Sequence, residues 1–337
     1  MGHVSNRNHG CRLKEILLKN SRALILENDR IHLLILLEKG ADIIEFNHKR
    51  TDTEFMWRSP AGLDLMTQTR TGRECYVGGW FETFPNGGPE YDWHSHPIPR
   101  YGDIRSMPWE FTVVKDEPEE TIVRLFANST ALPLALERTM TLKAHDDTLH
   151  IDESVRNLSQ EEIRFSWGHH PNIGAPFLNG NCVIDLPDCE MYGIDVDEAG
   201  NEVERFKGKW PMATIDGIPT DLSKVPQPDA EPANLFFLRN LAEGRASVRN
   251  TRTGIGIGFT WDASVFKNLV LWRAFGSDHW DPTFGRLYLL CFFLRSCHGN
   301  KLDVDDERIA LAPQETLRTW LKATILTGRG NGEGDGD

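Results

Sequence analysis

Short apolar runs separated by turn residues are the feature that most constrains the fold of this chain. Between residues 22 and 57, runs rich in Ile and Leu alternate with the polar turns "END" and "EKGAD". Apolar runs of about four to eight residues between such turns are typical of antiparallel strands. The same pattern returns at 109–129, 136–159, 163–171, 246–262, 269–275, 286–296 and 316–326. We therefore expect a chain built mainly of antiparallel strands.

Helical periodicity is nearly absent: only residues 11–22, "CRLKEILLKNSR", sustain the apolar spacing of a helix. The connections at 85–103 and 217–234 are longer than ordinary turns, and long loops in a compact domain tend to carry sites. We predict one all-β domain over residues 1–326, a large antiparallel β-sandwich with few short helices. Residues 327–337 are acidic and glycine-rich, with nothing apolar to bury, and are predicted to be disordered.

The charge of the chain restricts its partners. With 37 basic and 50 acidic residues the net charge is −13, which argues against nucleic acid and anionic membranes as partners. No apolar run reaches the roughly 18 residues of a membrane-spanning helix, and the N-terminus lacks the apolar core of a signal peptide. The six cysteines show no C-x-x-C spacing and are predicted to be reduced packing residues. We therefore expect a cytoplasmic protein.

Two histidines in the first long connection suggest a metal site. In a strand, His94 and His96 would point to the same face, a spacing found among metal ligands. With Gly88 they match the first half of the cupin metal motif, but Arg100 and Tyr101 stand where that motif needs a glutamate. A metal-dependent isomerase that uses His94 and His96 is therefore an alternative, and the leading hypothesis includes no metal.

Four other stretches occur in a fixed order: "GGWFETFPNGG" at 78–88, "YGDIRSMPWEF" at 101–111, "WGHHPNIGAPFL" at 167–178 and "LAPQETLRTWLKATI" at 311–325. With these motifs on an all-β background, the chain resembles the aldose 1-epimerase (galactose mutarotase-like) family, most of all its divergent branch. The resemblance covers roughly residues 20–325. It implies the β-sandwich of that family and an isomerase that needs no cofactor.

The resemblance also implies a catalytic pair. His170, directly before Pro171, matches the family's histidine, and Glu315 in "LAPQE" matches its glutamate, with Gln314 in place of a glycine. By resemblance, Glu315 is the base that takes the proton of the C1 hydroxyl, and His170 is the acid that protonates the ring oxygen. Ring opening, rotation about C1–C2 and reclosure would then interconvert the α and β anomers.

Two positions depart from the family pattern. Tyr101 stands where many relatives have a second histidine, and His96 is close enough in the loop to substitute for it. Phe293 and Leu294 stand where many relatives have Glu-Pro. These departures support a second hypothesis, a non-catalytic carbohydrate-binding protein on the same scaffold.

Side chains suited to sugar binding lie in or beside the same stretches. Indole rings stack on the apolar faces of sugars, although any one tryptophan can equally be core filler. Arginine forks bind carboxylate and phosphate, which makes an anionic sugar an option. The predicted partner is a monosaccharide or a sugar derivative, and the predicted substrate-binding residues are Arg73, Trp80, Asn86, His96, Tyr101, Arg105, Trp167 and Trp272. The oligomeric state is left open.

Overall fold

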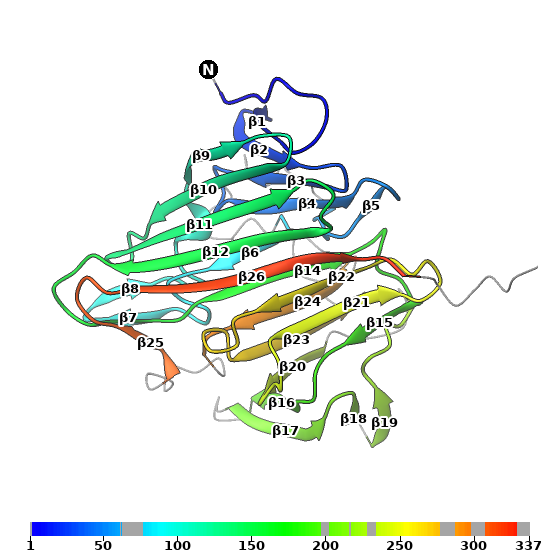
Figure 1. Ribbon diagram of the computed structural model, residues 1–337. Coiled ribbons are helices and arrows are strands. Elements are labelled where there is room, and N and C mark those ends of the chain that lie inside the picture. Colours follow the sequence, from blue (N-terminus) through cyan, green and yellow to red (C-terminus); the bar gives the residue numbers. More distant parts are fainter. Residues whose placement is uncertain are drawn as a thin grey trace, which may run out of the picture.

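The structure is a computed structural model that describes residues 2–60, 62, 77–196, 202–215, 217–227, 234–276, 287–297 and 307–328. The described chain forms two antiparallel sheets packed face to face, and Figure 1 shows the smaller sheet crossing in front of the larger one. The predicted β-sandwich is thus confirmed. No helix among the residues listed above is long and apolar enough to cross a membrane.

The large sheet has fourteen strands. Their spatial order is β1 (Arg12–Leu18), β2 (Ser21–Glu27), β3 (Ile31–Leu36), β4 (Asp42–His48), β6 (Trp80–Thr83), β14 (Gly168–Gly174), β24 (Tyr288–Arg295), β23 (Asn268–Phe275), β20 (Asn234–Arg239), β16 (Glu190–Val196), β17 (Glu202–Lys209), β18 (Met212–Ile215) and β19 (Ile218–Asp221), with β5 (Thr53–Glu54) paired to β4. At its centre β6, β14 and β24 lie side by side, so three distant parts of the sequence meet there.

The second sheet has eight strands. Their order is β15 (Cys182–Asp185), β21 (Arg245–Asn250), β22 (Gly256–Trp261), β26 (Thr316–Leu326), β12 (Thr148–Asn157), β11 (Leu134–Lys143), β10 (Glu120–Asn128) and β9 (Glu110–Asp116). Two small antiparallel pairs and one 3-10 turn complete the described elements: the hairpin of β7 (Tyr91–Trp93) and β8 (His96–Ile98), the pair of β13 (Ile163–Phe165) and β25 (Ile309–Leu311), and η2 (Ile104–Ser106).

The main core lies between the two sheets. In β11, Leu134, Leu136, Arg138, Met140 and Leu142 are buried and alternate with more exposed residues, as the two-residue period of a strand requires. The apolar side chains among them join apolar residues of the large sheet in one continuous cluster. Burial of each such side chain contributes about 1.5–3 kcal/mol.

The large sheet also buries part of its other face, which we call the outer face. In β23, Leu269 and Leu271 belong to the core, whereas Val270 and Ala274 join a separate cluster on the outer face. That cluster includes Trp57, Tyr192, Phe237, Cys291 and Phe293, with Tyr101 and Trp272 packed against it. Strands that are buried on both faces have nearly continuous apolar sequences, and "LVLWRAF" and "LYLLCFFL" are such sequences.

The helical spacing at residues 11–22 is misleading, because this segment is the hairpin β1–β2. Its turn is Lys19–Asn20, both with positive φ (48° and 66°), as two-residue hairpin turns require. Leu13 packs in the core, whereas Ile16 and Leu18 pack against a cluster on the other face of the sheet. Apolar residues on both faces of one strand imitate the spacing of a helix.

The described cysteines are Cys11, Cys182, Cys189, Cys291 and Cys297, all free and buried, as predicted for packing residues. Cys75 lies outside the described residues, as does most of the predicted disordered tail.

Candidate functional site

The adjacent histidines of "GHHPN" serve two different places. Along β14 successive side chains alternate between the faces of the sheet, so His169 points into the core and His170 to the outer face. The His170 ring stacks on Phe81 with centroids 4.4 Å apart and an interplanar angle of 13°. Its Nδ1 lies 3.1 Å from Sγ of Cys291. A strand thus carries both histidines because each completes a different group of side chains.

The surroundings of His170 form a closed ring of contacts. From Phe81 the ring continues to Arg105, whose Cζ lies 4.5 Å from the phenyl centroid, and then to Tyr101 at 5.6 Å. Tyr101 meets Phe293 edge-on at 6.2 Å, and Phe293 returns to His170 at 4.8 Å. Three aromatic side chains, one imidazole and one guanidinium therefore enclose one patch of the outer face.

Two more side chains extend this patch. The ring of Trp272 lies 6.0 Å from that of His170, and Cζ of Arg295 lies 5.2 Å from the Phe293 ring. We call Phe81, Tyr101, Arg105, His170, Trp272, Phe293 and Arg295 the His170 cluster. Tyr101 and Trp272 are partly exposed, and the other members are buried. The cluster is thus a largely desolvated site with access at two aromatic side chains.

His170 is neutral at physiological pH. Burial, the Arg105 guanidinium and, more weakly, the Arg295 guanidinium lower the pKa of His170 to about 3, against a partial opposing effect of its own carbonyl and of Asn172. The prediction of an imidazolium acid at neutral pH is therefore wrong. A neutral imidazole can accept a proton or a hydrogen bond at one nitrogen and donate at the other.

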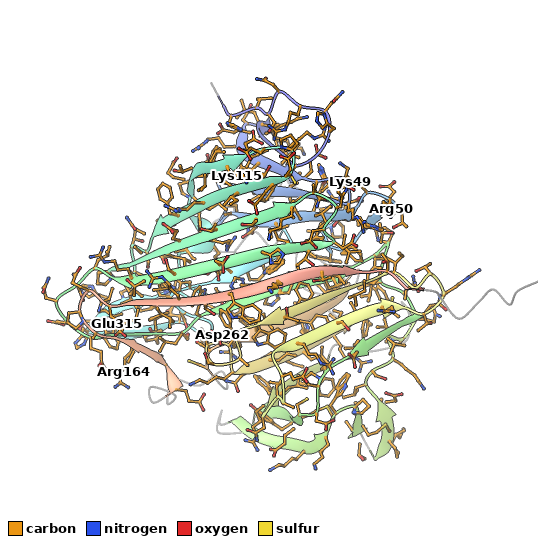
Figure 2. All side chains as sticks on the ribbon, in the orientation of Figure 1. Lys49, Arg50, Lys115, Arg164, Asp262 and Glu315 are labelled. Carbon is orange, nitrogen blue, oxygen red and sulfur yellow. The ribbon has the colours of Figure 1, made fainter. Side chains whose placement is uncertain are left out.

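Glu315 is not beside His170. It lies in the turn between β25 and β26, where its exposed carboxylate accepts the backbone N–H of Ala312 at 2.8 Å. Figure 2 shows Glu315 near Arg164 at the edge of the molecule. Strand β26 belongs to the eight-stranded sheet, which covers the inner face of the large sheet, whereas His170 faces outward. Because the large sheet separates them, the predicted acid–base pair is wrong.

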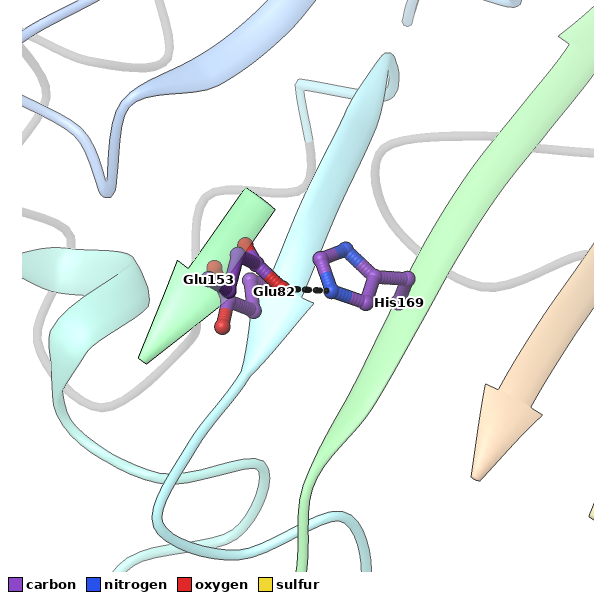
Figure 3. Close-up of side chains that lie close together, drawn as sticks. All are labelled: Glu82, Glu153 and His169. Carbon is purple, nitrogen blue, oxygen red and sulfur yellow. Dashed lines mark hydrogen bonds and ion pairs between the residues drawn. The ribbon is translucent and has the colours of Figure 1, made fainter. Parts of the chain in front are cut away.

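The other histidine, His169, belongs to a buried network between the sheets (Figure 3). Its Nε2 lies 2.9 Å from Oε2 of Glu153, and its Nδ1 accepts the indole N–H of Trp80 at 3.3 Å. Since Nδ1 accepts, Nε2 carries the hydrogen and donates to Glu153. Arg138 donates to Glu153 at 3.0 Å and also pairs with Glu82. We call Glu82, Arg138, Glu153 and His169 the buried network.

The buried network has the residue types of a metal site but does not fit a metal. Ligand atoms of Glu82, Glu153 and His169 lie within 4.8 Å of one another. Each carboxylate oxygen already accepts a hydrogen bond: those of Glu82 from Arg138 and Trp167, and those of Glu153 from Arg138 and His169. A cation would have to displace these donors and would be repelled by the guanidinium. The group is therefore a satisfied structural network.

The pKa values of the two carboxyl groups in the buried network shift in opposite directions. Burial and the neighbouring Glu153 charge raise the pKa of Glu82. Glu153 is equally buried, but His169 and Arg138 outweigh that effect and hold its pKa below the ordinary value. The network therefore keeps Glu153 ionised inside the core.

Of the predicted binding residues, Tyr101, Arg105 and Trp272 lie beside His170. Trp80 and Trp167 do not, because both point into the core and donate their indole N–H groups to the buried network. Their predicted role in binding is wrong. Arg73 lies outside the described residues.

Asn86 and His96 lie outside the His170 cluster. Among the described residues, the amide of Asn86 donates to the carbonyls of Gly88, Pro89 and Pro99 and accepts from the Gly88 N–H and the Ser166 hydroxyl. His96 is exposed in the β7–β8 pair, and His94 is in its turn with φ of 47°, so the two do not share a strand face. Among the described residues they join no third ligand, which removes the basis of the cupin-type alternative.

The comparisons with known proteins agree with the fold. Residues 19–281 match the model of a family described as a domain of unknown function, DUF4432. The chain belongs to the DUF4432 family. A search of curated proteins gave no match for this DUF4432 chain.

Solved structures share the architecture of this DUF4432 protein. A Klebsiella pneumoniae protein provisionally named an aldose 1-epimerase aligns over 97% of this chain and 87% of its own, with a TM-score of 0.72 and 13% identity. A galactose mutarotase-like protein from Clostridium acetobutylicum aligns over 94% and 98%, with a TM-score of 0.68 and 15% identity. A galactose mutarotase related enzyme from Lactobacillus acidophilus aligns over 90% and 97%, with a TM-score of 0.63 and 17% identity. At these identities the similarity establishes the galactose mutarotase-like fold.

Proposed function

We propose that this protein binds a monosaccharide or a sugar derivative at the His170 cluster. The observation that carries the proposal is the ring of contacts around His170, which brings three aromatic side chains together with a guanidinium and an imidazole. Aromatic faces stack on the C–H faces of sugars, while Tyr101, Arg105 and His170 offer hydrogen bonds to hydroxyl groups. The galactose mutarotase-like fold supports the same conclusion.

Two features favour binding over rapid catalysis. Phe293 occupies the place beside His170 where the family resemblance expects the glutamate of Glu-Pro, so this position supplies a phenyl ring and no carboxylate. In addition, a histidine with a pKa of about 3 is a weak base at neutral pH, and acid–base catalysis works best when the pKa lies near the working pH. Sugar binding is therefore the leading function.

Anomer interconversion is the second candidate, because a neutral imidazole can work as a single base. His170 would take the proton of the C1 hydroxyl as the bond from C1 to the ring oxygen opens, with a guanidinium stabilising the negative ring oxygen. After rotation about C1–C2, that oxygen would attack the other face of the carbonyl, and the imidazolium would return its proton to O1. This cycle needs no second titrating group.

The test is calorimetric binding of a panel of hexoses, pentoses, hexose phosphates and uronic acids. Trp272→Ala is expected to weaken binding by about tenfold or more, as loss of a stacked aromatic anchor does. Trp320→Ala is the matched control, because Trp320 is 39% exposed on the eight-stranded sheet. No binding across the panel, or equal effects of the two substitutions, would overturn the proposal.

Catalysis is measured separately by NMR exchange between the anomers of any sugar that binds. Exchange faster than in buffer, and lost in His170→Gln, would establish the second candidate. Binding at unchanged exchange rates would leave a carbohydrate-binding protein.

A further inference from the structure

Three arginines surround one pair of aromatic rings in the His170 cluster. The Cζ atoms of Arg100 and Arg105 lie 4.8 Å and 5.6 Å from the Tyr101 centroid. Arg295 lies over Phe293 at 5.2 Å, and Phe293 meets Tyr101 edge-on at 6.2 Å. We call Arg100, Arg105 and Arg295 the arginine group.

The arginine group brings three guanidinium groups together within a strongly negative protein. The chain carries a net charge of −13, yet three guanidinium groups meet here. Arg105 and Arg295 are each only 3% exposed. Their positive potential reaches His170, whose pKa both guanidinium groups help to lower. In a desolvated site such charges act strongly on a ligand, because water screens them little.

The segment that carries Tyr101 and Arg105 is held in place. Gly102 has a φ of 75° and pairs with Phe84, and a Cβ at Gly102 would lie only 1.9 Å from the Phe84 carbonyl oxygen. The backbone N–H of Tyr101 donates to the carbonyl of Gly88 at 3.0 Å. Because this close approach admits only glycine, the loop is fixed against β6 before any ligand binds. Pre-organised donors lose less entropy on binding.

We propose that the sugar bound at the His170 cluster carries a phosphate or carboxylate group, and that the arginine group binds this anion. The proposal rests on the proposed function and names its substrate class. Guanidinium forks match the paired oxygens of both anions, and Tyr101, a partly exposed residue whose hydroxyl accepts a hydrogen bond from Arg100 at 3.2 Å, can donate to the same ligand. The partly exposed Trp272, whose ring lies 6.0 Å from that of His170, is the aromatic side chain offered to the sugar ring itself.

The experiment compares four probes by titration calorimetry: a hexose, its 6-phosphate, the corresponding hexuronate and orthophosphate alone. At least one anionic sugar is expected to bind about tenfold or more tightly than the neutral hexose, the usual effect of a hydrogen-bonded charge. Its affinity is expected to fall as sodium chloride is raised, whereas that of the hexose stays constant.

Substitutions test whether the arginine group causes the tighter binding of the anionic sugar. Arg100 is exposed, so Arg100→Gln is expected to fold normally and to weaken the anionic sugar several-fold without changing the hexose. Arg105→Gln is expected to weaken the anionic sugar more strongly, and to weaken the hexose as well, because Arg105 also faces the sugar in the His170 cluster. Arg124→Gln, on the exposed side of β10, is the control and is expected to change neither affinity.

The outcomes separate this inference from the proposed function. Equal affinity for the hexose and both anionic sugars overturns the anionic ligand and leaves sugar binding intact. If orthophosphate binds as tightly as the sugar phosphate, the site does not recognise the sugar, and the proposed sugar binding is overturned. The arginine group would then be an anion-binding site only. If none of the four probes binds, both the anionic ligand and the proposed sugar binding are overturned.

Discussion

His169 and His170 are neighbours in the sequence, but their rings lie on opposite faces of β14. His169 is hydrogen-bonded to Glu153 in the core, and His170 is stacked on Phe81 at the outer face. A substitution at either histidine therefore tests a different property of the protein. His169 bears on stability through the buried network, whereas His170 bears on the proposed ligand binding and, through its lowered pKa, on the pH dependence of stability.

Loss of Arg138 should destabilise the fold strongly. Arg138→Met would leave the buried carboxyl groups of Glu82 and Glu153 without their shared cation. Removal of one partner from a buried ionic group costs about 3–5 kcal/mol. Urea unfolding measures this, with Arg124→Met at the surface as a control that should stay within about 0.5 kcal/mol. A similar small loss in both variants would contradict the role given to the network.

The stability of the protein should depend on the protonation of His170. Its pKa is about 3 when folded and 6.5 in the unfolded reference, so below pH 6.5 the unfolded chain binds a proton that the folded protein excludes. The free energy of unfolding contributed by this group is therefore complete above pH 6.5 and is lost as the pH falls, by up to about 1.4 kcal/mol per pH unit.

The measurement is urea unfolding between pH 6.5 and 4 for the native protein and His170→Asn. The difference between their unfolding free energies isolates His170 from the other titrating groups. The unfolding free energy of the native protein should decrease relative to that of His170→Asn as the pH falls. Parallel curves would show that His170 titrates normally in the folded protein.

Trp167 and Trp272 should have separable effects. Trp167→Phe removes the indole N–H that donates to Glu82, which should cost about 1–3 kcal/mol of stability, because an acceptor in the core loses its donor. Sugar affinity should not change, because Trp167 faces away from the His170 cluster. Trp272→Ala should reduce affinity. Reduced binding in folded Trp167→Phe would show that this indole reaches the ligand.

The described thiols should be unreactive in the folded protein. Burial raises the pKa of Cys11 and Cys182 to about 11 and that of Cys189 to about 12, and it also raises the pKa values of Cys291 and Cys297. Since the thiolate is the reactive form, a disulfide reagent at pH 8 should modify none of them rapidly. Cys75→Ser removes the sixth cysteine from the assay, and rapid release of a chromophore from that variant would contradict the burial.

The sequence predicts the fold well because two-residue alternation is a local property. Runs such as "LALERTMTL" show which side chains face the core, and the structure places Leu134, Leu136 and Met140 there. The hairpin at 11–22 was missed because apolar residues on both faces of β1 lack that alternation.

The site was harder to predict, because it depends on which strands become neighbours. Charged residues at inward positions, Arg138 in β11 and Glu153 in β12, interrupt the alternation and are the signal for the buried network. Phe81 and Cys291 carry no such signal, since they resemble ordinary core residues until β6 and β24 flank β14. The assignment of Glu315 failed for the same reason: its motif does not determine on which side of the large sheet it lies.

The position of β24 between β14 and β23 determines when the His170 cluster becomes complete during synthesis of the chain. Phe293 and Arg295 come from a strand that ends at residue 295 of 337, and they complete a site begun by Phe81 and His170. A ribosome must therefore synthesise the chain past Arg295 before the proposed ligand site is complete. Products truncated before β24 would lack Phe293 and Arg295, so they would not form the proposed ligand site.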